Sequence, residues 1–205
     1  MAVSRIKTSS VLQGFPKSRS LLAGNAAYDP AGTWFIQRVT ATGSETTLSF
    51  TSIPQTYSSL QIRGITRRNS TGTSVEIFEL GCNSDAGSNF TTHQLYGNGT
   101  TVTATGQAAN TYDNSAVGWM MYGTATAGMF GATIIDIHDY ASTTKYKTRR
   151  IFSGVDSNAA FAGGQRVGLV SSLWMSTNAI TSLQLYANGN TWAAGTTFAL
   201  YGMVG

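Results

Sequence analysis

Short stretches of alternating apolar and polar side chains run through most of the chain after residue 32. In the segment 59–65, Leu60 and Ile62 fall on one side of an extended strand. Gln61 and Arg63 fall on the other side. No segment keeps an apolar period of 3.6 residues through three helical turns. The pattern predicts short β-strands and less than about 10% helix.

The strand-like runs are too numerous for a single open sheet of ordinary size. They cover residues 33–40, 46–50, 59–65, 74–80, 92–96, 100–105, 117–122, 129–140, 147–155, 166–174, 180–187 and 197–203. The first two runs flank the turn residues 42–44 and are predicted to form a hairpin. The expected fold class is all-β, a two-layer antiparallel β-sandwich over residues 31–205.

Residues 1–30 differ from this body. The segment is basic and rich in serine, and two prolines, Pro16 and Pro30, interrupt it. Its few apolar residues cannot form a core, but Phe15 and the paired Leu21 and Leu22 are unusual for a solvated tail. We expect an extended N-terminal arm that orders on a partner surface.

Charge separates the same two parts. Residues 1–24 hold four basic residues and no acid, whereas residues 25–205 hold 9 basic and 9 acidic residues and are neutral. A nucleic-acid reader needs clustered lysine and arginine on its body, so the sequence argues against a nucleic-acid partner. Charged residues make up only 11% of the 205 residues. This low fraction favours a subunit whose surface is covered by neighbouring chains.

No feature of the sequence indicates a membrane span, a secretory leader, a disulfide or a cofactor. No run of about 18 apolar residues occurs, and the start lacks the apolar stretch of a signal peptide. The single cysteine, Cys82, is expected to have no nearby basic group that would lower its pKa, and it is predicted to be a small apolar filler. Asp136 and His138 share one strand face and could offer two metal ligands, but no third ligand is evident. A structural role is favoured for both.

Catalysis is the weaker class of function. The chain has no G-x-S-x-G elbow, phosphate loop, dinucleotide fingerprint or EF-hand spacing. Asp85 and Asp113 could form the carboxylate pair of a glycosidase, although both also suit Asx-turns. The tryptophans could stack on sugars, with Trp192 in an expected hairpin turn, but core packing accounts for most of them. We expect a protein that is not an enzyme.

The segment 145–150 is the main basic cluster of the body. Strand alternation would place Lys145, Lys147 and Arg149 on one face, with Arg150 on the opposite face. Two interpretations stay open. Such a strand could protect an exposed sheet edge, or it could dock an acidic partner.

Three segments carry a resemblance to a known family. Residues 9–25 (SSVLQGFPKSRSLLAGN), 52–64 (SIPQTYSSLQIRG) and 197–202 (TFALYG) resemble virion structural proteins of marine and cyanobacterial tailed phages. The resemblance implies a jelly-roll-like sandwich and a role in capsid decoration, as a cement protein that binds the major capsid protein. The alternative is a tail or fibre appendage with a host glycan or receptor contact in residues 83–114. A glycan-binding or glycan-cleaving module is a third possibility.

We therefore expect a virion location after assembly in the host cytoplasm, and self-association, with a trimer favoured. The predicted partner-binding residues are Arg5, Lys7, Phe15, Lys17, Arg19, Leu21, Leu22, Lys145, Lys147, Arg149 and Arg150.

Overall fold

A computed structural model describes residues 32–112, 115–158 and 165–204. Strands make up 57% of the structure and helices are absent from the described residues. The strands are β1 (Thr33–Thr40), β2 (Thr47–Phe50), β3 (Ser59–Thr66), β4 (Arg68–Asn69), β5 (Glu76–Cys82), β6 (Phe90–Gly97), β7 (Val102–Asn110), β8 (Ala116–Met120), β9 (Gly131–His138), β10 (Lys147–Asp156), β11 (Gln165–Trp174), β12 (Leu183–Tyr186), β13 (Thr191–Trp192) and β14 (Thr197–Met203). The predicted all-β class is confirmed.

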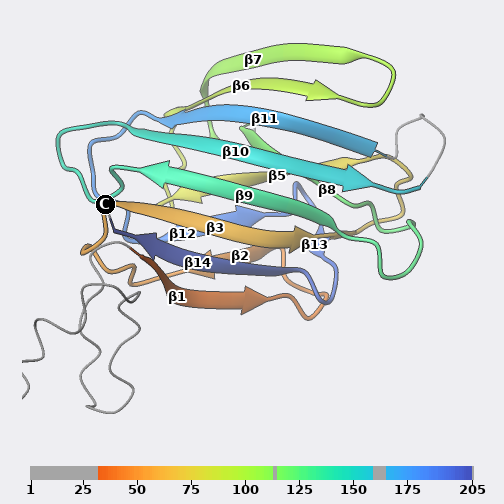
Figure 1. Ribbon diagram of the computed structural model, residues 1–205, viewed down its shortest axis with the longest axis horizontal. Helices are drawn as coiled ribbons and strands as arrows, with labels where there is room; N and C mark the ends of the chain where they lie inside the picture. The colour runs from red at the N-terminus through yellow and green to blue at the C-terminus, as the bar shows by residue number, and fades with distance from the viewer. Residues whose placement is uncertain (1–31, 113–114, 159–164, 205) are drawn as a thin grey trace, which may run out of the picture.

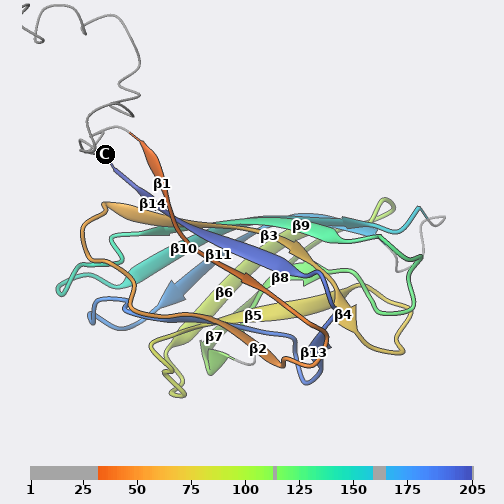
Figure 2. The same cartoon turned by 90° about the horizontal axis from the view of Figure 1, so that it is seen from below.

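Two antiparallel sheets pack face to face (Figures 1 and 2). The larger has the order β1-β14-β3-β9-β10-β11-β6-β7, and the smaller has the order β2-β12-β5-β8. A two-strand ribbon of β13 and β4 lies beside them. The prediction of a two-layer antiparallel sandwich is therefore confirmed.

The connections are those of a jelly roll. Four links, β1 to β2, β3 to β5, β8 to β9 and β12 to β14, each carry the chain from one sheet to the other, if the short β4 and β13 are set aside. The resulting half-sheets, β1-β14-β3-β9 and β2-β12-β5-β8, have the eight-strand jelly-roll order. Two hairpins, β6–β7 and β10–β11, are inserted into this plan and extend the larger sheet to eight strands.

The first predicted hairpin is wrong. β1 pairs with β14 and β2 pairs with β12, so the turn between them crosses from one sheet to the other. The carboxylate of Glu45 holds this turn. It accepts hydrogen bonds from the Thr42 hydroxyl at 2.6 Å and from the backbone N–H groups of Thr42, Gly43 and Ser44. A polar turn next to two apolar runs therefore does not by itself distinguish a hairpin from a crossover.

The Glu45 turn makes stability depend on pH. The Thr42 hydroxyl, with the backbone N–H groups, lowers the pKa of Glu45 from 4.5 to about 2. Because the folded pKa lies below the unfolded one, the stabilisation is present above pH 4.5 and is lost as the pH falls towards 2. We expect Glu45→Gln to lower the melting temperature at pH 7, and the gap from wild type to close near pH 2. An equal gap at both pH values would contradict this role.

Aromatic side chains fill the space between the sheets. The ring centroids of Phe78 on β5 and Phe198 on β14 lie 5.9 Å apart, and Trp192 packs edge-on against both rings. Trp192 is fully buried, as are Trp119 and Trp174 to within 1%. Trp192 lies in β13, which pairs with β4 and not with the preceding β12, so the expected hairpin is wrong. Core packing accounts for these three tryptophans.

Candidate interaction surface

Part of the predicted partner-binding set lies outside the described residues. This holds for Arg5, Lys7, Phe15, Lys17, Arg19, Leu21 and Leu22, and also for Asp113. Their roles stay predictions. The basic cluster at residues 145–150, by contrast, is described in full.

β10 is not an edge strand, so the edge-protection interpretation of residues 145–150 is wrong. It pairs with β9 on one side and β11 on the other, in the middle of the larger sheet. Every second side chain of β10, beginning with Lys147 and Arg149, points into the sandwich. Both of these side chains are fully buried. Lys147 and Arg149 therefore cannot line an exposed docking surface, which corrects their assignment as partner-binding residues. The sequence pattern correctly predicts that the two side chains share one face of the strand, but it does not predict that this face is buried.

Arg149 ties the two sheets together from inside. Its guanidinium donates to the backbone carbonyl of Leu80 on β5 at 2.6 Å and to the hydroxyl of Ser172 on β11. The group also lies 5.2 Å from the centroid of the Phe90 ring. Burial lowers the pKa of Arg149. The residue thus joins three strands through one buried polar group.

Cys82 lies against Arg149, so the expectation that no basic group is near it is wrong. Burial nevertheless dominates over this positive charge and raises the pKa of the thiol to about 11. At neutral pH the side chain is a neutral thiol. The predicted role of a small buried filler fits this environment.

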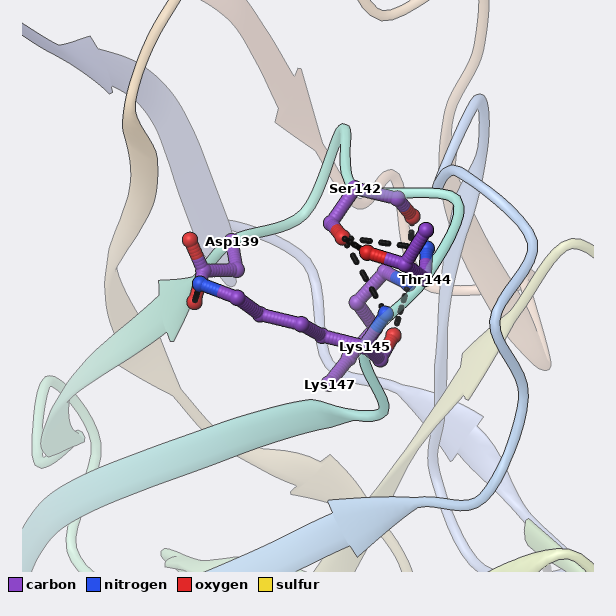
Figure 3. A network of polar contacts seen from close by, with 5 residues as sticks. All are labelled: Asp139, Ser142, Thr144, Lys145 and Lys147. Atoms are coloured by element: carbon purple, nitrogen blue, oxygen red, sulfur yellow. Dashed lines mark hydrogen bonds and ion pairs between the residues drawn. The ribbon is translucent and has the colours of Figure 1, made fainter.

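Lys147 and its neighbours organise a loop instead (Figure 3). The Lys147 ammonium donates to the carbonyls of Ser142 and Lys145, and to those of Ser176 and Thr177 in the loop after β11. Figure 3 also shows the exposed ion pair between Lys145 and Asp139, whose N–O distance is 2.9 Å. Four carbonyl acceptors occupy Lys147, so its role is structural.

Arg150 is the member of the cluster that reaches the outer face of the larger sheet, the face turned away from the smaller sheet. Its side chain is 68% exposed and forms an ion pair with Asp136 at 3.1 Å. Gln61 donates a second hydrogen bond to the same carboxylate. Asp136 is thus engaged by Arg150 and Gln61, in line with the favoured structural role. Among the described residues, no group of three or more metal-type ligands comes together.

Asp85, the other candidate carboxylate, closes a local turn. It accepts hydrogen bonds from the Gly87 N–H, the Asn89 amide and the Trp174 indole, the last at 2.7 Å. Burial raises the pKa of Asp85, but these bonds outweigh it and the net pKa is lowered. An aspartate held in its charged form by three donors is a poor general acid. The contacts of Asp85 therefore fit the Asx-turn alternative.

The outer face of the larger sheet carries exposed apolar side chains that sequence reasoning did not identify. Ile134 on β9, Phe152 on β10, Leu169 on β11 and Leu95 on β6 are directly paired across four neighbouring strands. Between 41% and 53% of each side chain is exposed. A second cross-strand row beside this one contains Ile65, Ala132, Gly154, Val167, Gly97 and Val102. We call the seven large side chains of these rows, Ile65, Leu95, Val102, Ile134, Phe152, Val167 and Leu169, the outer-face patch.

Basic residues border this patch on one side. Arg38 on β1 and Arg63 on β3 flank Ala199 of β14 on the same face, and both arginines are exposed. The Arg63 guanidinium lies 5.1 Å from the ring centroid of Tyr201. β1, β14 and β3 contain no acidic residue. A surface that covers this face must therefore be apolar over the patch and suited to positive charge beside it.

The signal for the patch was present in the sequence. β9, β10 and β11 each contain two adjacent large apolar residues, Ile134-Ile135, Ile151-Phe152 and Leu169-Val170. Because neighbouring residues in a strand point to opposite faces, such a pair places one apolar side chain outside whenever the other is in the core. The strand order that aligns the three pairs could not be obtained from the pattern.

Comparisons with known proteins do not identify a function for this surface. No protein-family model matches the sequence, and no curated protein shows significant similarity to it. Within the described residues, no helix is long and apolar enough to cross a membrane.

Proposed function

We propose that the chain is a structural protein of a tailed-phage virion, and that it decorates the capsid by binding the major capsid protein. The observation that carries the proposal is the outer-face patch, since soluble monomers rarely expose large apolar side chains in contiguous rows. The jelly-roll order supports it, because capsid subunits commonly use this architecture. A fold alone does not assign a function, so the surface carries the argument.

The chemistry of the face selects the kind of partner. The patch supplies apolar area, and Arg38 and Arg63 beside it favour acidic groups on the partner surface. The first 24 residues of the arm carry four further basic residues and no acid. An apolar partner surface with acidic groups at its margin satisfies both parts of the chain. We propose that this partner surface belongs to the capsid shell.

A tail or fibre appendage is the second candidate, because the cleft described below could contact a host surface. Immunogold electron microscopy of the particles whose genome encodes the chain distinguishes the two candidates. Label on the capsid lattice is the expected result, and label confined to the tail would establish the appendage. Absence of the chain from purified particles would overturn the virion proposal altogether.

Deleting residues 1–24 is expected to give a folded body that no longer attaches to particles. Burial of Phe15, Leu21 and Leu22 stabilises attachment by about 1.5–3 kcal/mol each. The four basic residues of the arm add attraction that salt weakens. Particle reconstitution with full-length and truncated protein measures the loss, and an unchanged melting temperature is the folding control. Equal occupancy of the two forms would show that the body alone attaches.

The proposed trimer has its own measurement. Low surface charge and the absence of disulfides from the sequence predict self-association. Analytical sedimentation of the full chain should give a mass of about three times 21.7 kDa at high micromolar concentration. A single 21.7 kDa species would contradict a trimer in solution.

A further inference from the structure

A cleft opens where the larger sheet extends beyond the smaller one. β6 and β7 continue the larger sheet past β8, the edge strand of the smaller sheet (Figure 1). The side chains of β7 are exposed on both of its faces over most of its length. The hollow between β6, β7 and the β5–β8 edge has a volume of about 290 Å³. This volume is at the lower end of the ~300–1,000 Å³ typical of ligand pockets.

Two aromatic rings and one guanidinium form one side of the cleft. The ring centroids of Tyr96 on β6 and Trp119 on β8 lie 5.4 Å apart. The Arg166 guanidinium lies 4.6 Å from the Tyr96 centroid and 5.9 Å from the Trp119 centroid. These contacts position a planar cation against an apolar wall.

Three polar side chains of the cleft form no hydrogen bond with the described chain. Arg166 forms no ion pair or hydrogen bond with the described residues, and its buried Nε lacks an acceptor there. The amides of Gln94 and Gln107, which also line the cleft, form no hydrogen bonds within the same part of the chain. Buried or half-buried planar donors are normally satisfied inside a protein. Arg166 and Gln94 are two half-buried groups of this kind, and the exposed amide of Gln107 lies beside them, so all three are available to a ligand.

The combination indicates the chemistry of the ligand. Glutamine amides offer both a donor and an acceptor, which suits neighbouring hydroxyl groups, and the half-buried Tyr96 ring suits the apolar C–H face of a sugar ring. A guanidinium pairs with a carboxylate through two parallel hydrogen bonds. Among the described residues that line the cleft, Arg166 is the one charged residue, and no described carboxylate forms an ion pair with it.

We propose that this cleft binds an acidic sugar unit, with the Arg166 guanidinium on the sugar carboxylate and the Gln94 and Gln107 amides on its hydroxyl groups. The site lies on the inner face of β6 and β7, away from the outer-face patch. It therefore goes beyond the proposed attachment role and leaves the patch free for the shell. Residues 94–107 also fall in the segment 83–114, to which the alternative hypothesis of a tail or fibre appendage assigns a host glycan or receptor contact.

Titration of the full chain with methyl β-glucuronide and, in parallel, with methyl β-glucoside tests the proposal. Calorimetry and saturation-transfer NMR should detect the glucuronide, with the neutral glucoside bound at least tenfold more weakly. Arg166→Met keeps an apolar side chain over the rings and should weaken glucuronide binding at least tenfold. Gln107→Ala, at an exposed position of β7, should weaken it about threefold to tenfold.

Two controls keep the test independent of folding and of attachment. Melting temperatures show whether each variant is folded, and Gln107→Ala decides the outcome if Arg166→Met is destabilised. Phe152→Asp on the outer-face patch should bind the glucuronide like wild type. No detectable glucuronide binding, equal affinity for both sugars, or unchanged binding by the folded variants would each overturn the proposal.

Discussion

Phe152→Asp is expected to weaken attachment to particles at least 100-fold while the protein stays folded. Phe152 lies between Ile134 and Leu169 in the first row of the outer-face patch. Attachment through the patch would bury its ring, a gain of about 1.5–3 kcal/mol that the variant loses. The variant also forces a carboxylate into an apolar contact, which adds a desolvation cost. A loss of about 2.7 kcal/mol already corresponds to 100-fold in affinity.

The same substitution should have little effect on folding, because Phe152 is 53% exposed in the isolated chain. We expect a melting temperature within about 4 °C of wild type, as a loss of about 1 kcal/mol gives in a chain of this size. Thr148→Asp is the matched control, since it adds the same charge to an exposed position on the same strand and face, outside the patch. Particle co-sedimentation measures the attachment of wild type, Phe152→Asp and Thr148→Asp. Equal attachment of Phe152→Asp and Thr148→Asp would assign attachment to another surface.

The period of two along the chain was sufficient to predict the layered all-β fold. Strands such as 59–66 and 147–156 alternate between buried and exposed side chains over their whole length. This local rule requires only that one face of a strand is covered. It carries no information on which strands are neighbours. For that reason the pattern predicts that the first two strands pair with each other, although in the structure each pairs with a strand near the end of the chain.

The basic segment 145–150 shows why charge is a poor guide to exposure. Lysine and arginine are rarely fully buried, so the sequence favoured an exposed strand. Lys147 and Arg149 are exceptions because backbone carbonyls of two loops accept hydrogen bonds from the Lys147 ammonium, and a carbonyl of β5 accepts one from the Arg149 guanidinium. Those carbonyls come from residues up to 69 positions away in the chain. No local pattern could have supplied this information.

The outer-face patch and the cleft differ in how far the sequence could have predicted them. Adjacent apolar residues in three strands indicate a second apolar face. The position of the patch can be predicted from them once the strand order is known. The cleft depends instead on the unequal width of the two sheets, which brings Arg166 of β11 to Tyr96 of β6 and Trp119 of β8. This inequality arises from the inserted hairpins β6–β7 and β10–β11. Such insertions leave no periodic signal.

Arg149→Ala should cause the largest loss of stability, about 3–5 kcal/mol, or a fall in melting temperature of roughly 6–20 °C. The truncation leaves a cavity between the sheets and removes the donor to the buried carbonyl of Leu80. Removing a desolvated charge offsets part of this loss. Arg149→Met retains most of the volume and removes the charge, so we expect it to lose only about 1–2 kcal/mol, the cost of the unsatisfied carbonyl. Chemical denaturation of both variants measures the difference.

Arg150→Ala is the matched control, because Arg150 is the next residue of β10 and points to the opposite face. Its ion pair with Asp136 is largely exposed on the arginine side, and such pairs contribute less than about 1 kcal/mol. The two arginines are adjacent in the sequence and identical in chemistry, so a large difference between their alanine variants must come from their different surroundings. If Arg149→Ala were as stable as Arg150→Ala, the cost of burying the Arg149 charge would cancel all of its packing and hydrogen bonds. Arg149 would then contribute nothing to holding β10 against β5.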